Sequence, residues 1–271
     1  MPDLKLDTLL EPVLTIAHGA GERILEIYAQ PFEVHDKSDG SPVTVADQAA
    51  HEFICAELAK LTPNCPVLSE ESSDAVKQAR LEWQEFWLVD PLDGTKEFIH
   101  KNGEFTVNIA LIRNRQPVLG VVTTPARGIA HFAAEGFGAF KREQDDTRPI
   151  RCRALDLSNP VLVASRSHAG EAVDKYRAAM EKKLGEITTM SMGSALKICL
   201  VAEGSADIYP RLGYTSEWDT AASHCVLNEA GGRLINLEGE ELPYNKPESL
   251  LNSWFLALGD PAHDWLGYLE T

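Results

Sequence analysis

The hexapeptide Asp-Pro-Leu-Asp-Gly-Thr, residues 90–95, constrains this chain more than any other segment. It follows the apolar run 86–89, which predicts a buried strand, so we expect the chain to turn at Asp90. Proline cannot continue the ladder of a strand, and Gly94 can adopt backbone conformations that other residues avoid. Asp90 and Asp93, held together at such a turn, repel each other unless a positive charge lies between them. The segment therefore predicts a site for a divalent metal ion with oxygen ligands.

Composition narrows the class of protein. The 271 residues are enough for one large core or two smaller ones, and 44% apolar residues is ordinary for a globular protein. Five cysteines without a Cys-x-x-Cys pair argue against a disulfide framework and a structural zinc site. The N-terminus does not resemble a signal peptide, and no apolar run approaches the roughly 18 residues of a membrane span. We expect a cytoplasmic protein, and docking to the inner face of the cell membrane stays open.

The formal charge of −16 argues against a nucleic-acid polymer as partner, because such binding depends on many lysines and arginines. It leaves a small anionic substrate possible, provided that cations gather at the binding site. Those cations must be basic side chains or metal ions.

Hydrophobic patterning divides the chain into two halves and predicts the α/β class. In residues 1–147, helices over 8–29 and from about 44 to 62 precede alternating segments that predict an antiparallel sheet. In residues 148–271, strands and helices alternate, which indicates a partly parallel sheet. The charged segment 142–148 is the predicted boundary between the halves.

Three further acidic segments carry both a structural and a functional interpretation. Asp219 lies near a predicted helix start, where capping alone is worth about 1 kcal/mol. Thr44 and Asp47 have the spacing of a capping box. Glu70 and Glu71 begin a run that a solvated acidic loop would also explain. Each segment alone is therefore ambiguous between structure and chemistry.

Together these segments resemble the motifs of the inositol monophosphatase superfamily, which consists of magnesium-dependent, lithium-sensitive phosphomonoesterases. Glu-Glu-Ser at 70–72, the hexapeptide at 90–95 and Trp-Asp-Thr-Ala-Ala at 218–222 occur in the order typical of that superfamily. The resemblance covers essentially the whole chain. It implies a layered α-β-α-β-α sandwich, in agreement with the two predicted halves.

The resemblance also implies how the acidic residues are used. Two or three Mg²⁺ ions are expected per site. The implied metal ligands are Glu70, Asp90, the backbone carbonyl of Leu92, Asp93 and Asp219. Thr95 is expected to contact the attacking water and to pass its proton toward Asp47, because a hydroxyl alone is too weak a base. Glu70 is counted with these two as catalytic, and the role of Glu71 stays open.

Three other stretches, residues 41–47, 165–168 and 193–204, are similar to the bacterial 3'(2'),5'-bisphosphate nucleotidases of sulfate assimilation. This similarity implies removal of the 3'-phosphate of adenosine 3',5'-bisphosphate, which leaves AMP, and 3'-phosphoadenylyl sulfate is a second candidate substrate. The expected substrate-binding residues are Glu70, Leu92, Asp93, Gly94, Thr95, Ser165, Arg166, His168, Ser194, Lys197 and Asp219.

The basic residues that are expected to bind substrate also have ordinary structural explanations. A basic pair after a strand commonly forms a solvated loop, and a helical lysine commonly faces water. An inositol or sugar monophosphatase would share the expected metal ligands, and a metal-binding regulatory module without turnover is the non-enzyme alternative. The sequence also leaves a monomer and a homodimer open.

Overall fold

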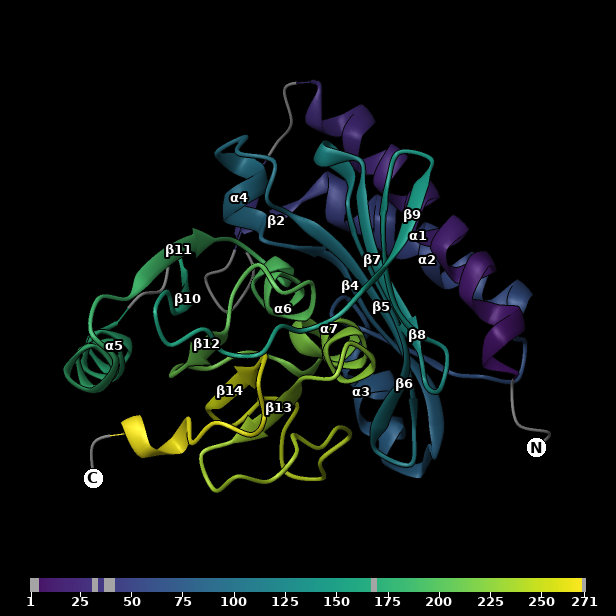
Figure 1. Ribbon diagram of the computed structural model, residues 1–271. Coiled ribbons are helices and arrows are strands. Elements are labelled where there is room, and N and C mark those ends of the chain that lie inside the picture. The colour runs from purple at the N-terminus through teal and green to yellow at the C-terminus, as the bar shows by residue number, and fades with distance from the viewer. Residues whose placement is uncertain (1–4, 31–33, 37–41, 167–169, 270–271) are drawn as a thin grey trace.

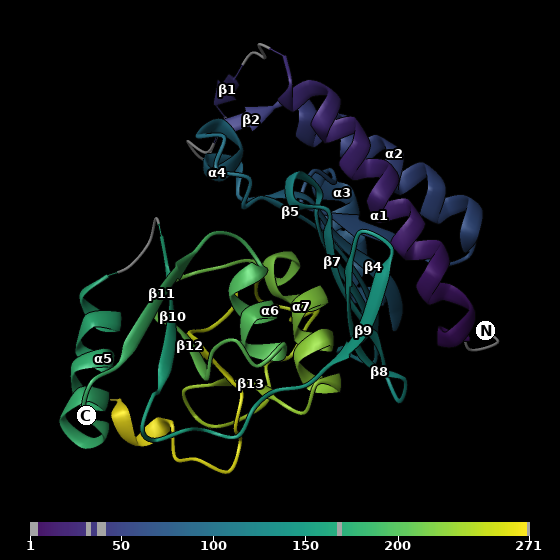
Figure 2. The same cartoon turned by 45° about the horizontal axis from the view of Figure 1, so that its top comes forward.

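The computed structural model of the protein describes residues 5–30, 34–36, 42–166 and 170–269. Its elements form five layers in the order helix, sheet, helix, sheet, helix (Figures 1 and 2). Four groups of buried apolar side chains fill the boundaries between these layers. The predicted α/β class and the layered α-β-α-β-α sandwich are confirmed.

The first sheet has seven strands in the order β3-β4-β5-β6-β7-β8-β9. Neighbouring strands are antiparallel except β3 and β4, which are parallel. The strands are β3 (Val67–Ser69), β4 (Glu85–Asp93), β5 (Thr106–Arg113), β6 (Gln116–Thr124), β7 (Ile129–Ala134), β8 (Gly138–Glu143) and β9 (Asp146–Ile150). Helices α1 (Leu6–Tyr28) and α2 (Val45–Leu61) cover its outer face, because each presents an apolar stripe to the sheet.

The second sheet has five strands in the order β11-β10-β12-β14-β13. Strand β10 is parallel to β11 and β12, whereas β14 is antiparallel to β12 and β13. The strands are β10 (Val161–Ser165), β11 (Thr188–Met192), β12 (Ile208–Arg211), β13 (Arg233–Asn236) and β14 (Phe255–Leu258). Helix α5 (Glu171–Leu184) and the short turn η3 (Leu266–Tyr268) pack on its outer face. The expected partly parallel second half is confirmed.

Helices α6 (Leu196–Ala202) and α7 (Glu217–Glu229) form the middle layer between the sheets (Figure 2). Ala221 and Ala222 of α7 pack against the first sheet, and Val226 packs against the second. The helix approaches β6 closely at Gly120, where an added Cβ atom would lie 2.1 Å from the carbonyl oxygen of Ala222. The close packing of the middle layer therefore depends on small residues. It brings the start of α7 near the carboxyl end of β4.

The remaining elements are short: β1 (Val34–Asp36), β2 (Pro42–Thr44), α3 (Asp74–Ala79), η1 (Arg80–Glu82), α4 (Thr95–Ile99) and η2 (Pro125–Arg127). The predicted helices over 8–29 and 44–62 are confirmed by α1 and α2. The expected boundary after residue 147 falls inside β9, which pairs with β8, so the first sheet continues to Ile150. Within the described ranges, no helix combines the length and apolarity needed to span a bilayer.

Candidate active site

The hexapeptide forms the end of β4 and the start of α4. Asp90 pairs with Asn108 and Asp93 pairs with Thr106 across β5, so β4 contains one extra residue and a bulge between its two aspartates. The expectation of a turn at Asp90 is therefore wrong: the strand continues to Asp93, because the bulge accommodates a proline that cannot donate to the ladder. The turn comes at Gly94, whose φ of +88° favours glycine.

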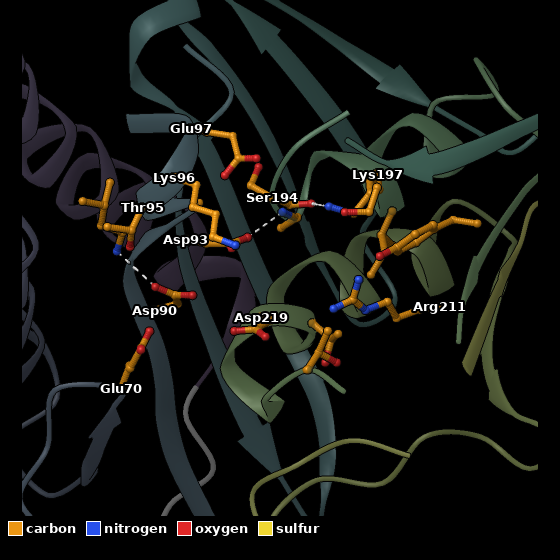
Figure 3. A pocket seen from close by; sticks show the side chains of 18 of the residues that line it. Glu70, Asp90, Asp93, Thr95, Lys96, Glu97, Ser194, Lys197, Arg211 and Asp219 are labelled. Carbon is orange, nitrogen blue, oxygen red and sulfur yellow. Dashed lines mark hydrogen bonds between the residues drawn. The ribbon is translucent and has the colours of Figure 1, made fainter. Parts of the chain in front are cut away.

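A pocket opens at this point, between the ends of β4, β10 and β12 and the starts of α4, α6 and α7 (Figure 3). It brings together predicted site residues from both halves of the chain. These are Glu70, Asp90, Leu92, Asp93, Gly94, Thr95, Ser165, Ser194, Lys197 and Asp219. Asp219 therefore shares one cavity with the hexapeptide, although more than a hundred residues separate them in the sequence.

Three predicted residues are placed differently. Asp47 is buried on α2 and is not among the residues that line this pocket, although its charge acts on Asp90. Arg166 also lies outside the lining, and its guanidinium is bound to Glu104. His168 lies outside the described residues. Direct roles of these three residues in the reaction stay predictions.

The carboxylates that line the pocket are buried and repel one another. Burial raises the pKa of Asp90 well above its usual range, and the charges of Glu70, Asp93 and Asp219 raise it further. Burial also raises the pKa of Asp93, against the attraction of Lys197. Oxygen donors that destabilise each other's charge fit a divalent cation, which would relieve the repulsion. Among the described residues, however, no three acidic, histidine or cysteine side chains lie close enough to form a metal-binding cluster by themselves.

The two aspartates from distant segments are each held by a backbone N–H group. Ala195 N–H donates to Asp93 Oδ2 at 2.6 Å, and Ser216 N–H donates to Asp219 Oδ2 at 2.8 Å. Ser216 and Asp219 form a capping box at the start of α7, so the capping interpretation of Asp219 is correct. Capping does not account for the pKa of Asp219, which burial and the charge of Asp93 raise to about 8.

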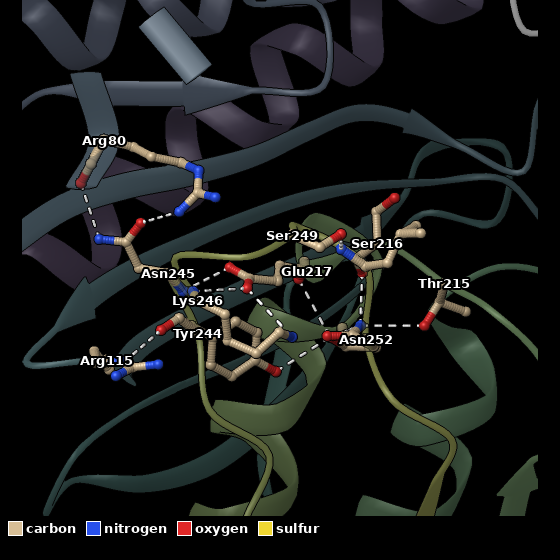
Figure 4. Close-up of polar contacts among 12 residues, drawn as sticks. Arg80, Arg115, Thr215, Ser216, Glu217, Tyr244, Asn245, Lys246, Ser249 and Asn252 are labelled. Carbon is tan, nitrogen blue, oxygen red and sulfur yellow. Dashed lines mark hydrogen bonds and ion pairs between the residues drawn. The ribbon is translucent and has the colours of Figure 1, made fainter. Parts of the chain in front are cut away.

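The start of α7 is anchored by a second buried carboxylate. Glu217, fully buried, accepts the backbone N–H groups of Asn245 (2.6 Å) and Lys246 (3.2 Å) (Figure 4). The side chain of Asn245 in turn accepts a hydrogen bond from the guanidinium of Arg80 at 2.8 Å. It also donates to the backbone carbonyl oxygen of Arg80 at 2.9 Å. This chain of contacts ties the helix that carries Asp219 to the half that carries Asp90 and Asp93.

The opposite wall of the pocket is positive (Figure 3). Lys197 is buried, bonds to the carbonyl oxygen of Ser194, and lies 5.5 Å from the ring centre of Tyr209. Burial lowers the pKa of Lys197 to about 8, although the charge of Asp93 opposes this shift. Arg211, at the end of β12, also lines the pocket, and its side chain donates to the carbonyl oxygen of Tyr214 at 2.8 Å.

Arg211 and Tyr209 are pocket residues that sequence analysis did not assign to the site. Tyr209 is buried, lines the pocket and also packs in one of the apolar core clusters. Arg211 had one available signal, because it stands at the carboxyl end of a strand in an α/β half, where ligands commonly bind.

A family model of the inositol monophosphatase family matches residues 5–262. The chain therefore belongs to the inositol monophosphatase family. It is 49% identical over 249 residues to the 3'(2'),5'-bisphosphate nucleotidase CysQ of Salmonella typhimurium, which covers 91% of this chain and 98% of that protein. The enzyme of the same name from Escherichia coli K12 is 48% identical over the same shares.

Solved structures agree with this assignment. The crystal structure of CysQ from Bacteroides thetaiotaomicron, described as a bacterial member of the family, superposes with a TM-score of 0.83 at 42% identity. The alignment covers 94% of this chain and 98% of that one. An inositol monophosphatase of Thermotoga maritima gives a TM-score of 0.77 at 25% identity, over 94% of each chain.

Proposed function

We propose that this protein is a magnesium-dependent phosphomonoesterase that removes the 3'-phosphate of adenosine 3',5'-bisphosphate to give AMP and phosphate. The observation that carries the proposal is one pocket lined both by carboxylates and by three cationic side chains, those of Lys96, Lys197 and Arg211. The names of the bacterial relatives point to the same reaction. Activity on 3'-phosphoadenylyl sulfate is part of the proposal, because that nucleotide carries the same 3'-phosphate.

The carboxylate wall would hold the metal ions. Glu70, Asp90, Asp93 and Asp219, with the carbonyl oxygen of Leu92, offer only oxygen donors, as magnesium prefers. When bound, magnesium would lower the pKa of a water and offset the charge of the phosphate ester. These ligands must be ionised to bind it, so the raised pKa values of Asp90 and Asp219 predict weaker metal binding at lower pH.

The remaining residues would orient the substrate. Thr95 lines the pocket at the start of α4, where its hydroxyl would position the attacking water, and the buried carboxylate of Asp47 would accept the proton. Lys197 and Arg211 would bind the 5'-phosphate, with Ser165 and Ser194 as hydroxyl partners. An inositol monophosphate lacks a second phosphate for Lys197 and Arg211, so these cations favour a bisphosphate.

The test is phosphate release from adenosine 3',5'-bisphosphate, 3'-phosphoadenylyl sulfate, inositol 1-phosphate and fructose 1,6-bisphosphate, each with and without Mg²⁺. We expect the two nucleotides to have the highest kcat/KM and all release to stop without metal. A preference for inositol 1-phosphate would replace the proposal with the monophosphatase alternative. Asp93→Asn is the matched inactive control: it should stay folded and release no phosphate.

A further inference from the structure

Glu104 is a buried carboxylate at the junction of the two halves, outside the pocket lining. Its side chain is 6% exposed, and the residue lies two positions before the start of β5. Both its oxygens accept from the guanidinium of Arg166, at 2.8 and 3.1 Å, and Oε1 also accepts from Arg127 at 3.1 Å. Arg127 belongs to the first half and Arg166 follows β10 in the second. The carboxylate therefore joins the halves through two charge-assisted contacts.

Glu104 also holds a backbone segment of the site. Its Oε2 accepts the N–H group of Gly193 at 2.8 Å, and Arg166 donates to the carbonyl oxygen of Ser191 at 3.0 Å. Gly193 fits tightly here, since an added Cβ atom would lie 2.5 Å from Cγ of Glu97. The contacts of Glu104 and Arg166 thus fix the chain just before residues 193–195, which we call the 193–195 turn.

The 193–195 turn leads directly to two pocket residues. Ser194 adopts a φ of +50°, so the chain reverses sharply there. The next N–H group, that of Ala195, donates to Asp93, and the carbonyl oxygen of Ser194 accepts from Lys197. A shift of Gly193 would therefore move the donor that orients the Asp93 carboxylate and the acceptor that holds the Lys197 ammonium.

We propose that Glu104 is a positioning residue for this reaction, which sets the orientation of Asp93 and Lys197 through the 193–195 turn. The inference rests on the proposed function, since it assumes that Asp93 and Lys197 act on metal and substrate. Arg166 then works by holding Glu104 and Ser191. Misplacement of reacting groups by about 1 Å can lower turnover about 100-fold, and loss of a contact that orients a metal ligand commonly weakens metal affinity about 10-fold or more.

The chain offers a matched control in Asp207. This carboxylate is fully buried, binds Arg153 through both oxygens at 2.6 and 2.7 Å, and accepts the backbone N–H of Val161 at 2.6 Å. It has the same kinds of partner as Glu104, but it lies in the second half and none of its partners lines the pocket. A purely structural role for Glu104 predicts that both substitutions act alike.

The experiment compares Glu104→Gln with Asp207→Asn. For each variant we would measure Tm, kcat and KM for adenosine 3',5'-bisphosphate, and Mg²⁺ affinity by calorimetry without substrate. We expect Glu104→Gln to lower kcat about 30- to 100-fold and Mg²⁺ affinity about 10-fold. Asp207→Asn should lower Tm at least as much, while its kcat and Mg²⁺ affinity stay within about twofold of wild type.

The proposal is overturned if folded Glu104→Gln keeps both kcat and Mg²⁺ affinity within twofold, or if Asp207→Asn loses them equally. Should Glu104→Gln fail to fold, Arg166→Lys keeps the positive charge but not the bidentate contact. We then expect a several-fold loss of kcat with KM unchanged, and wild-type kcat would refute the inference. If wild type releases no phosphate from any substrate, the proposed function fails, while the Mg²⁺ calorimetry still tests the positioning of Asp93.

Discussion

At Lys197, burial and electrostatic attraction act in opposite directions. Burial disfavours the charged ammonium and lowers its pKa to about 8, and the charge of Arg211 adds to this effect. The charge of Asp93 favours the protonated form but does not restore the ordinary value. Near pH 7 Lys197 is therefore charged and available to a phosphate, and above about pH 8 it is increasingly neutral.

This titration predicts the pH dependence of substrate capture. For adenosine 3',5'-bisphosphate at saturating Mg²⁺, kcat/KM should fall as pH rises from 8 to 9, because it reports groups of the free enzyme. In Lys197→Arg the side chain stays charged, so the fall should disappear even if the starting value is lower. Steady-state kinetics from pH 7 to 9 measure both profiles. An identical decline in the variant would show that another group is responsible.

Individual residues of the site were predictable from the sequence only where the signal is local. Asp90, Asp93 and Gly94 lie within five residues, so one short motif was enough to predict that they lie together, and all three line the pocket. The proposed role of Glu104 depends on partners 62 and 89 positions away in the sequence, so no local motif could have predicted it. For Arg166 the sequence predicts a substrate contact, which stays a prediction, and only the structure reveals that its guanidinium binds Glu104.

Among the elements, the position of helix α7 is determined by Gly120 of β6, against which it packs. It crosses the inner face of the first sheet where β6 has Gly120, so the backbone of Ala222 approaches that strand directly. Asp219 lies one turn before Ala222, on the same helix. The distance between Asp219 and the aspartates of β4 therefore depends on how deeply α7 lies on the sheet.

Gly120→Ala tests this dependence. The added methyl group would lie 2.1 Å from a backbone oxygen that cannot rotate away, so α7 or β6 must shift. We expect a loss of about 2–3 kcal/mol in the free energy of unfolding by urea, within the range typical of overpacking. Gly170→Ala is the control, since an added Cβ there meets nothing within 4 Å, and it should cost less than about 1 kcal/mol. Equal stability of the two variants would contradict the close approach.

Most elements could be predicted because their sequences show either a helical period or a short apolar run. The long helix α1 has most of its buried positions three or four residues apart, whereas β7 is a short apolar run that is buried almost throughout. Strand β9 was missed because four of its five residues are exposed and the segment is charged, so it looked like a linker. Its pairing with β8 is set by the hairpin, which composition does not reveal.

At the scale of the whole molecule, the two halves are joined by a buried charge cluster. Glu203, at the end of α6, accepts from His131 of β7 at 3.0 Å and pairs with Lys141 of β8 at 2.9 Å. Burial alone would raise the pKa of Glu203, but these two partners lower it to about 2. A carboxyl group whose pKa is lower in the folded state stabilises the fold above its ordinary value of 4.5. That contribution is lost as pH falls from 4.5 toward 2.

Glu203→Gln should therefore destabilise the junction of the halves. It should also reduce how much the free energy of unfolding falls between pH 7 and pH 3. Removing one partner of a buried pair leaves the other charge uncompensated, so we expect a loss of about 3 kcal/mol at pH 7. Urea unfolding at pH 7, 5 and 3 measures this, and the gap to wild type should narrow at pH 3. The control is Glu143→Gln, because Glu143 also pairs with Lys141, at 2.8 Å, but is half exposed. Its loss should therefore destabilise the protein much less than the loss of Glu203. If both variants lose the same stability at every pH, Glu203 is not what joins the halves.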